Sequence, residues 1–434
     1  MHTTTTRSQY VLPLQGVLVK EQDDWTFNGA STRTLTHCFH DYPARMIPQI
    51  ASKLLDKFGG KAKLLFDPYC GTGTSQVEAV IRGIDAIGTD LNPLARLIAQ
   101  AKTSIPNRRQ LDNELKRFYK LIAQTTPKDY ASTISQVHGI TRLDFWFKPV
   151  VVRKLSYLRS FIDEIKDKTI RTFFQVAFSE TVRDSSNTRS EEFKLYRYDE
   201  ERLRRFNPDV FGIMCQKLQR NRPGLESFLK IIEGLDRQAV AHIYDFNTVN
   251  GIPSDYVEPS SVDIVITSPP YGDSHTTVAY GQYSRLSAAW LGLSEPANID
   301  NKLMGGKVYK QIPDFPCEKL NTTLSQIRKQ DEKRAREVAS FYLDLQESIA
   351  NVAKAIRHSG YACYVVGNRK VKGLMLPTDD AIRCLFENHS FRYVDTFLRS
   401  IPNKRMPLRN SPTNIAGALD NTMVNEFIVV MQKR

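Results

Sequence analysis

The stretch that most constrains the fold of this chain runs from Val262 to Gly272 and reads VDIVITSPPYG. Its β-branched residues between Val262 and Ile266 are typical of a buried strand. Pro269 and Pro270 then hold φ at about −65°, remove two N–H donors and bar the preceding residue from the helical region. The strand must therefore end in a rigid, extended turn, with carbonyl groups that no following helix takes up. In an open α/β sheet, the crevice at the carboxyl ends of the strands is where ligands bind.

This turn suits the methylation of an exocyclic amino group on a planar ring. Such a nitrogen is a poor nucleophile, because its lone pair is delocalised into the ring. Acceptors aimed at its two N–H bonds favour the pyramidal form and direct the lone pair toward an incoming methyl group. We expect those acceptors to be Ser268 Oγ and the carbonyl oxygens of Ser268 and Pro269, with Tyr271 stacked on the base. Catalysis would then rest on positioning and electrostatics.

A glycine loop lies earlier in the chain, in the sequence LLFDPYCGTGTSQVEAVIRG. The pattern predicts a strand over residues 63–66, a tight loop through Gly71 and Gly73, and a helix from about Thr74. Glycines let the backbone approach a ligand closely, and a helix N-terminus offers free N–H groups to an anion. The dinucleotide-binding pattern is incomplete, because Gln76 stands where its third glycine belongs. Taken alone, the loop is a weak signal.

Two further predicted strands end in acidic residues. The sequence DAIGTD ends in Asp90, and Asn92 with Pro93 then opens a helix. An acid roughly 20 residues after a glycine loop has the spacing needed to bind a ribose diol. The sequence AHIYDFNTV predicts another short strand that ends in Asp245 and Phe246.

Together, DPYCGTGT, TDLNP and TSPPY resemble the motifs of the amino-directed DNA methyltransferases that use S-adenosylmethionine. The serine of TSPPY is most similar to the cytosine-N4 branch, whereas adenine-N6 members more often carry Asp or Asn there. The resemblance covers roughly residues 37–105 and 236–434. It implies an α/β fold with a Rossmann-like class I methyltransferase sheet, S-adenosylmethionine as the cofactor, double-stranded DNA as the partner, and a restriction-modification role.

The resemblance also implies roles for individual residues. In the donor site, Asp67 would bind the amino group of the donor, and Asp90 would bind its ribose hydroxyls. Asp245 would accept from the adenine amino group, and Phe246 would pack on the adenine ring. The predicted cofactor-binding residues are Asp67, Gly71, Gly73, Asp90, Asn92, Asp245 and Phe246, and the predicted catalytic residues are Ser268, Pro269, Pro270 and Tyr271. A segment with His40, Tyr42, Pro43 and Arg45, expected to enter a helix after Pro43, matches one that packs against the methionine end of the donor in the family.

At 434 residues, the chain is long enough for one large domain with insertions or for two domains. We predict an N-terminal arm over residues 1–36 and a catalytic core over residues 37–105 and 236–434. Residues 106–235 are predicted to form a mainly helical insertion and are a candidate DNA-recognition region. Within the core, residues 302–336 are predicted to form a charged excursion that ends in a solvated helix.

The net charge of +13 and the isoelectric point near 9.3 fit a polyanionic partner such as double-stranded DNA. The best candidates for phosphate contacts lie in the sequence RSIPNKRMPLRNSPTN, which resembles a variable loop near the target base in the family. These candidate DNA-binding residues are Arg399, Lys404, Arg405 and Arg409.

The six cysteines form no close pair and no C-x-x-C, which argues against a metal site and a disulfide framework. The N-terminus lacks an apolar signal core, and no run of about 18 apolar residues occurs. We therefore expect a cytoplasmic protein with no metal and no membrane partner. The sequence leaves open whether the protein is a monomer or a homodimer.

Several alternatives remain at this stage. Adenine-N6 methylation would use the same acceptors, and RNA methylation, including guanine-N2, would lack a recognisable RNA-binding module. Cytosine carbon-5 methylation needs a Pro-Cys loop at the fourth strand, whereas Pro316 and Cys317 lie in the polar excursion. A non-catalytic DNA-binding subunit with the same fold is disfavoured, because the TSPPY motif is intact.

Overall fold

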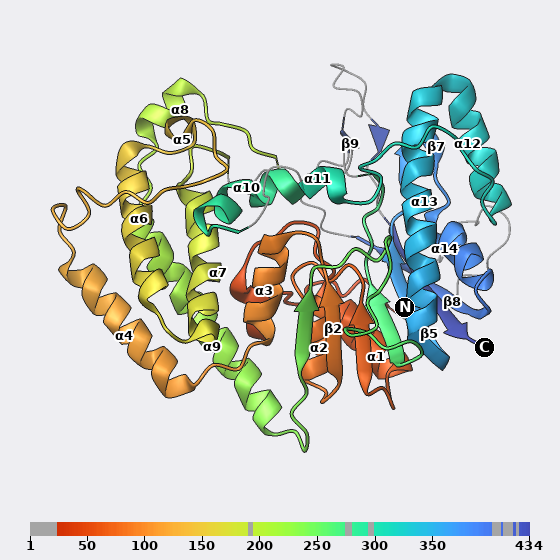
Figure 1. Ribbon diagram of the computed structural model, residues 1–434, viewed down its shortest axis with the longest axis horizontal. Coiled ribbons are helices and arrows are strands. Elements are labelled where there is room, and N and C mark those ends of the chain that lie inside the picture. Colours follow the sequence, from red (N-terminus) through yellow and green to blue (C-terminus); the bar gives the residue numbers. More distant parts are fainter. Residues whose placement is uncertain are drawn as a thin grey trace, which may run out of the picture.

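The computed structural model describes residues 24–189, 194–273, 280–293, 299–401, 409–410, 420–421 and 425–434. In this part of the chain, seven strands form the main sheet in the order β3-β2-β1-β4-β5-β11-β8. All neighbouring pairs are parallel except those of β11, which runs antiparallel to β5 and β8. This mostly parallel, open sheet confirms the predicted α/β, Rossmann-like fold (Figure 1).

The first four strands of the sheet lie close to the four segments that the sequence predicts. The first four that the chain forms in this sheet are β1 (Leu64–Asp67), β2 (Asp85–Thr89), β3 (Ala241–Tyr244) and β4 (Val262–Thr267). The other three are β5 (Ile356–Val366), β8 (Phe391–Ser400) and β11 (Asn425–Lys433). Two short ribbons are formed by β6 (Lys370–Val371) with β7 (Leu374–Met375), and by β9 (Arg409–Asn410) with β10 (Asp420–Asn421).

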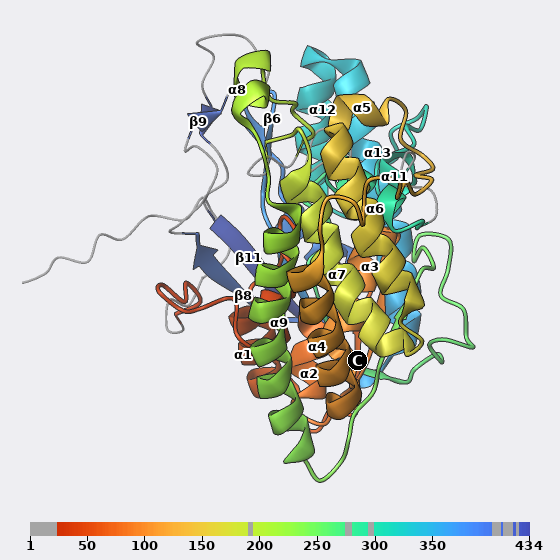
Figure 2. The same ribbon diagram turned by 90° about the vertical axis from the view of Figure 1, so that its left-hand side faces the viewer.

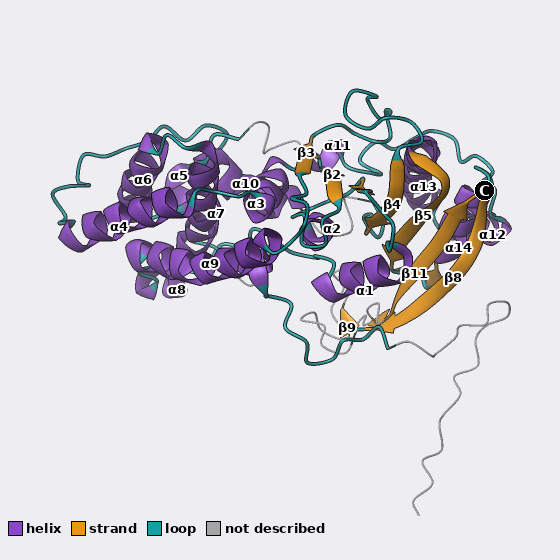
Figure 3. Ribbon diagram, turned by 90° about the horizontal axis from the view of Figure 1, so that it is seen from below, coloured by secondary structure: helices purple, strands orange, loops and turns teal. Residues whose placement is uncertain are grey.

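Helices cover both faces of the sheet (Figure 3). Because side chains alternate along a strand, Ile264 and Ile266 of β4 belong to the core with α1 (Pro48–Phe58). Val265, between them, packs instead with α13 (Glu332–Ala355) and α14 (Thr378–Glu387). The crossover helices α2 (Thr74–Val80) and α3 (Pro93–Thr103) follow β1 and β2.

The first long helix starts later than predicted. A 3₁₀ turn, η1 (Leu35–Phe39), precedes it, and α1 begins at Pro48 and not directly after Pro43. The reason is local: a proline at the first helical position bars Ile47 from the helical region, and Ile47 has ψ of 144°. Ala44 adopts a left-handed φ of 49°. The chain between Pro43 and Ile47 is therefore non-helical and available to line a site.

A group of helices fills the stretch that the sequence predicts to be helical. Its members are α4 (Arg108–Gln124), α5 (Leu143–Trp146), α6 (Pro149–Glu164), α7 (Lys168–Ser185), α8 (Glu200–Arg205) and α9 (Val210–Glu233). The group lies at the β3 end of the sheet, opposite β8 (Figure 3). Its core includes Phe118, Phe174 and Leu218, all fully buried. Helices α4 and α9 run alongside each other (Figure 2). An ion pair links them, with Arg222 Nε of α9 lying 2.8 Å from Asp112 Oδ1 of α4.

The charged excursion is better packed than predicted. Helix α12 (Glu318–Gln330) buries Leu320, Leu324 and Ile327 against α13, so it is not a solvated helix. The predicted single helix is also divided, because Asp331 caps α13 by accepting a hydrogen bond from Arg334 N at 2.9 Å. A hydrophobic residue about every third or fourth position is enough to bury one face of a helix rich in charge.

Only the end of the predicted N-terminal arm lies among the described residues. There Trp25 is buried and stacks on Phe397 of β8 at a ring-centroid distance of 4.8 Å. Between α9 and α12, the chain also forms α10 (Tyr280–Trp290) and α11 (Ile299–Lys302). None of the helices in the described ranges combines the length and the apolar character that crossing a bilayer requires.

Candidate active site

The site lies where the strand order changes direction. β1 and β4 are parallel neighbours, although β2 and β3 separate them along the chain. Residues beyond the carboxyl ends of β1, β2, β3 and β4 line one cavity of about 970 Å³, including its open mouth. Such a switch point is the expected ligand position in an open α/β sheet.

The two glycines of the loop have different surroundings. Both have left-handed φ values, 49° for Gly71 and 74° for Gly73. Gly71 lines the cavity, and a Cβ there would meet no atom of the described chain within 4 Å. Gly73 does not line it: a Cβ at Gly73 would lie 2.9 Å from Ala99 Cβ of α3. The expected backbone approach to a ligand therefore fits Gly71, whereas Gly73 permits the close packing of α2 and α3.

Asp90 fastens the loop after β1 to the end of β2. Its Oδ2 accepts a hydrogen bond from Gly71 N at 3.0 Å, and its Oδ1 accepts one from Asn92 N at 2.7 Å. Burial raises the pKa of Asp90, although both hydrogen bonds oppose that shift. Asn92 caps α3 and donates to Tyr42 Oη at 2.9 Å and to Ser284 Oγ at 2.7 Å. Asp90 and Asn92 both line the cavity.

Asp67 is a buried acid on the cavity wall, 3% exposed. Its Oδ1 accepts from Thr267 Oγ1 at 2.5 Å and from Tyr69 N at 3.1 Å. Burial raises its pKa to about 6, and the hydrogen bond from Thr267 opposes that shift. Because Thr267 immediately precedes Ser268, Asp67 connects the loop after β1 to the TSPPY turn.

The end of β3 corrects one prediction. Phe246 lines the cavity and stacks near Phe66, with ring centroids 6.3 Å apart. The side chain of Asp245 is 74% exposed, lies 3.7 Å from Arg96 Nη2 and does not line the cavity. Asp245 therefore faces Arg96 and solvent, outside the cavity. Asn247 lines the cavity instead, a residue that the sequence analysis did not select.

The segment from His40 to Ile47, called segment 40–47 below, forms another wall. Tyr42, Pro43 and Arg45 line the cavity. His40 does not: it is 1% exposed, and neither ring nitrogen has a hydrogen-bond partner among the described residues. Desolvation lowers the pKa of His40 well below its usual range, so the imidazole is neutral.

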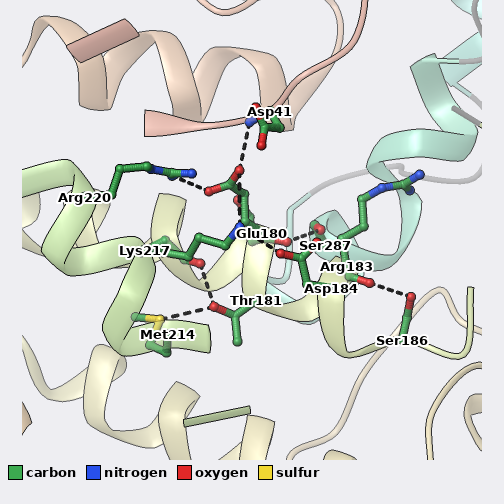
Figure 4. A network of polar contacts seen from close by, with 12 residues as sticks. Asp41, Glu180, Thr181, Arg183, Asp184, Ser186, Met214, Lys217, Arg220 and Ser287 are labelled. Carbon is green, nitrogen blue, oxygen red and sulfur yellow. Dashed lines mark hydrogen bonds and ion pairs between the residues drawn. The ribbon is translucent and has the colours of Figure 1, made fainter. Parts of the chain in front are cut away.

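The helical group holds segment 40–47 in place (Figure 4). Glu180 of α7 accepts from Asp41 N at 2.8 Å and from Arg220 Nη2 of α9 at 2.5 Å. Arg220 also donates to Phe39 O at 2.7 Å. On the other side, Tyr283 Oη of α10 donates to Asp41 O at 2.6 Å. Both polar groups of the Asp41 backbone are therefore held by helices outside the sheet.

The TSPPY turn borders two cavities. Ser268 and Pro270 line the large one, and Pro269 is buried. Tyr271 borders a smaller cavity of about 190 Å³. Its hydroxyl accepts from Ser268 Oγ at 3.2 Å and donates to Glu426 Oε1 of β11 at 2.9 Å. Removal from water and the Glu426 carboxylate raise the pKa of Tyr271 well above its usual value, so the phenol keeps its proton.

Ion pairs with two arginines hold Asp273, which lies two residues after Tyr271. Asp273 is 2% exposed and accepts from Arg334 Nη2 of α13 at 2.9 Å, with Arg369 Nη1 at 3.4 Å. Gly272 has φ of 151°, and a Cβ there would lie 2.3 Å from Arg369 Nη1. A side chain at this position would have to displace Arg369, and the positive φ independently favours glycine.

The predicted phosphate contacts have mixed outcomes. Arg399 is only 8% exposed, and Glu426, opposite it on β11, pairs with its guanidinium. It is thus a buried, paired cation and not an exposed contact for phosphate. Lys404 and Arg405 lie outside the described residues, and Arg409 is described only as part of β9. Their predicted contacts with DNA remain predictions.

Comparison with known proteins decides the family. The type II methyltransferase M.MvaI of Kocuria varians is 39% identical over 422 residues, which cover 94% of this chain and 93% of that protein. The chain belongs to the type II methyltransferases. The type II methyltransferase M.BsoBI of Geobacillus stearothermophilus is 24% identical over 278 residues, 60% of this chain and 53% of its own. S-adenosylmethionine is therefore the methyl donor of this methyltransferase.

Other comparisons add little. No family model matches the chain. Among solved structures, the rRNA methyltransferase aviRa of Streptomyces viridochromogenes aligns with 91% of this chain and 88% of its own, at 12% identity and a TM-score of 0.32. That score is too low to support an argument about this methyltransferase.

A first prediction concerns Glu180. Replacing it with glutamine removes the charge that pairs with Arg220, so segment 40–47 should lose its fixed position and S-adenosylmethionine should bind more weakly. We expect the dissociation constant, measured by isothermal titration calorimetry, to rise roughly 2- to 30-fold, the range of indirect coupling between sites. Asp184→Asn is the matched control, because Asp184 lies on the same helix and pairs with Lys217 at 2.8 Å. Equal weakening by both variants would refute the role of Glu180.

Proposed function

We propose that this type II methyltransferase transfers the methyl group of S-adenosylmethionine to the N4 amino group of cytosine in double-stranded DNA, as part of a restriction-modification system. The observation that carries the proposal is the shared cavity: Ser268 and Pro270 of TSPPY line the same space as Asp67 and Asp90. The acceptor groups proposed for the base thus lie beside the groups proposed for the donor. The type II designation of the relatives supports the restriction-modification role.

The lining of the cavity fits the donor chemically. The buried carboxyl of Asp67 suits the amino group of the methionine part, and the carboxylate of Asp90 suits the two ribose hydroxyls. Phe246 offers an apolar face for the adenine ring, and Asn247 replaces Asp245 as the polar group proposed to contact the adenine edge. When bound, S-adenosylmethionine would supply an electrophilic methyl group on a positively charged sulfur; as the N–C bond forms, the S–C bond would break, the neutral thioether would leave, and the methylated nitrogen would lose one proton to solvent.

The acceptors of the TSPPY turn would orient the target amino group. Neither proline has an N–H group, so the turn presents oxygen atoms without competing donors. Ser268 Oγ and the carbonyls of Ser268 and Pro269 would accept the two amino hydrogens and direct the nitrogen lone pair toward the methyl group. Preorganised groups of this kind lower the barrier without a covalent intermediate. Serine in this position is the feature that favours cytosine over adenine.

Duplex DNA fits the remaining features of the chain. The net charge of +13 favours a polyanion. A base inside a duplex must be extruded before an enzyme can reach its amino group, at a cost of about a few kcal/mol. In Figure 1, the tops of the helical group and of the α12–α13 pair both rise beyond the carboxyl edge of the sheet. We propose that the duplex lies against this edge, with the extruded base directed toward Ser268.

The test is the identity of the methylated nucleoside. The purified protein is incubated with labelled S-adenosylmethionine and unmethylated duplex DNA, the DNA is digested, and the nucleosides are separated by mass spectrometry. We expect N4-methylcytosine. A yield of N6-methyladenine would keep amino methylation and overturn the choice of base. No labelled nucleoside from DNA, with a labelled product from RNA under the same conditions, would overturn DNA as the substrate.

A further inference from the structure

Four polar side chains from three separate parts of the chain form a continuous line that ends in the active site. Ser268 Oγ lies 3.2 Å from Tyr271 Oη, which lies 2.9 Å from Glu426 Oε1. The other carboxylate oxygen of Glu426 pairs with Arg399. Glu426 and Arg399 are direct partners in the β11–β8 ladder, so the register of two antiparallel strands sets this pair. Among the four, Ser268 borders the large cavity.

The chemistry of these groups fixes the direction of each hydrogen bond. An ionised carboxylate only accepts, and a guanidinium only donates. With Arg399 beside it, Glu426 remains the acceptor, so the Tyr271 hydroxyl must give its proton to Glu426. Tyr271 Oη then has only lone pairs to offer to Ser268. The single hydroxyl proton of Ser268 is thereby directed at Tyr271, and the remaining lone pairs of Ser268 Oγ are left for the cavity.

We propose that Glu426 is a positioning residue that acts through Tyr271 to make Ser268 an acceptor toward the substrate. This inference rests on the proposed amino methylation. An amino group brings N–H donors to Ser268 Oγ, whereas the carbonyl of a keto base would meet oxygen lone pairs. The line of hydrogen bonds therefore selects amino bases and rejects keto bases at the same position, because a buried polar group without a partner is costly.

Glutamine at position 426 is the informative replacement. Its shape is nearly that of glutamate, but its amide carries two N–H donors. When the amide oxygen faces Arg399, the amide nitrogen faces Tyr271 and donates to it. Tyr271 can then donate to Ser268, which occupies one of the two lone pairs of Ser268 Oγ and leaves its proton free to point at the substrate. Tyr271→Phe keeps the ring and breaks the line, so that the Ser268 hydroxyl rotates freely.

The experiment measures the single-turnover rate of methyl transfer at saturating donor and DNA for Glu426→Gln, Tyr271→Phe and the double variant. We expect Glu426→Gln to lower the rate at least about 10-fold in the wild-type background, since a preorganised hydrogen-bonding group contributes roughly 10²–10³ in rate. In the Tyr271→Phe background, the same replacement should change the rate less than about twofold, because nothing then transmits its effect.

Asp263→Asn is the matched control. Asp263 lies at the opposite end of β4, pairs with Arg357, and has a side chain 11% exposed, against 14% for Glu426. Its replacement should lower the melting temperature and leave the rate of the folded enzyme unchanged. A purely structural role for Glu426 would lower the rate by the same factor in both backgrounds, and that outcome would overturn the inference. So would a Glu426→Gln variant with the wild-type rate.

The product of the wild-type enzyme distinguishes a failure of this inference from a failure of the proposed function. Nucleoside analysis of its product shows whether an amino group is methylated at all. A wild type that methylates no amino base contradicts the proposed function and, with it, the role of Ser268. A wild type that does so, combined with a fully active Glu426→Gln variant, contradicts the hydrogen-bond inference alone. Donor affinity, measured for every variant, should stay within about twofold of the wild-type value.

Discussion

Replacing Ser268 with alanine should lower the single-turnover rate of methyl transfer by about 10²–10³-fold, the loss typical of one preorganised hydrogen-bonding group. Alanine removes Oγ, the acceptor that we assign to the amino group, and leaves both prolines and the strand that precedes them intact. The affinity for S-adenosylmethionine should change less than about twofold, because an interaction made mainly in the transition state affects the rate and not the binding of the donor. Rapid-quench assays with labelled donor measure the first quantity, and calorimetry measures the second.

A matched serine controls for general effects of the replacement. Ser261 directly precedes the same strand at its other end, where its Oγ donates to Glu258 O at 2.7 Å. Ser261→Ala should therefore keep the wild-type rate. If Ser268→Ala also keeps that rate, the carbonyl groups of the turn suffice, and the preference for cytosine that we derive from the serine loses its basis.

The parts of the site that the sequence predicts well are those fixed by short-range geometry. Gly71 and Asp90 belong to one continuous βαβ unit, so the spacing between them determines that the loop after β1 meets the end of β2. The same holds for TSPPY, where the two prolines dictate the turn regardless of what surrounds it. In each case, the backbone alone places the residue at the cavity.

Side-chain direction after a strand is harder to predict. Asp245, Phe246 and Asn247 are consecutive, and the family resemblance pointed to the acid, Asp245, although Phe246 has a polar neighbour on each side. The choice is made by packing, because Phe246 turns toward Phe66 and its carbonyl accepts from Thr89 Oγ1 at 2.6 Å. A polar residue on each side of an aromatic residue at a strand end was the available signal, and both candidates deserved equal weight.

Contacts between distant segments left no local signal at all. Glu426 is 155 residues from Tyr271, and Glu180 is 139 residues from Asp41. The assignment of Arg399 to phosphate failed for the same reason. Arg399 forms an ion pair with Glu426 on the neighbouring strand, and the sequence did not reveal the register of the two strands. A cation in a basic loop is an ambiguous feature until its neighbours on the adjacent strand are known.

Asp90→Ala should have the complementary effect to Ser268→Ala. We expect the dissociation constant of S-adenosylmethionine to rise about 10- to 100-fold, because hydrogen bonds to a charged group contribute about 1.5–3 kcal/mol. The loss has two sources: the acceptor proposed for the ribose hydroxyls disappears, and Gly71 N and Asn92 N lose the carboxylate that holds them. At saturating donor, the rate of methyl transfer should remain near that of the wild type.

Asp245→Ala is the control that makes this result specific. Both residues are acids that follow neighbouring parallel strands, yet Asp245 is largely exposed and does not line the cavity. Its replacement should leave donor affinity unchanged within about twofold, which calorimetry resolves readily. Equal weakening by the two variants would mean that the negative charge at this edge of the sheet attracts the positively charged donor from a distance. Direct contact with the donor is proposed for Asp90 but not for Asp245, so it could not explain an equal effect. An unaltered affinity in Asp90→Ala would refute its assignment to the ribose.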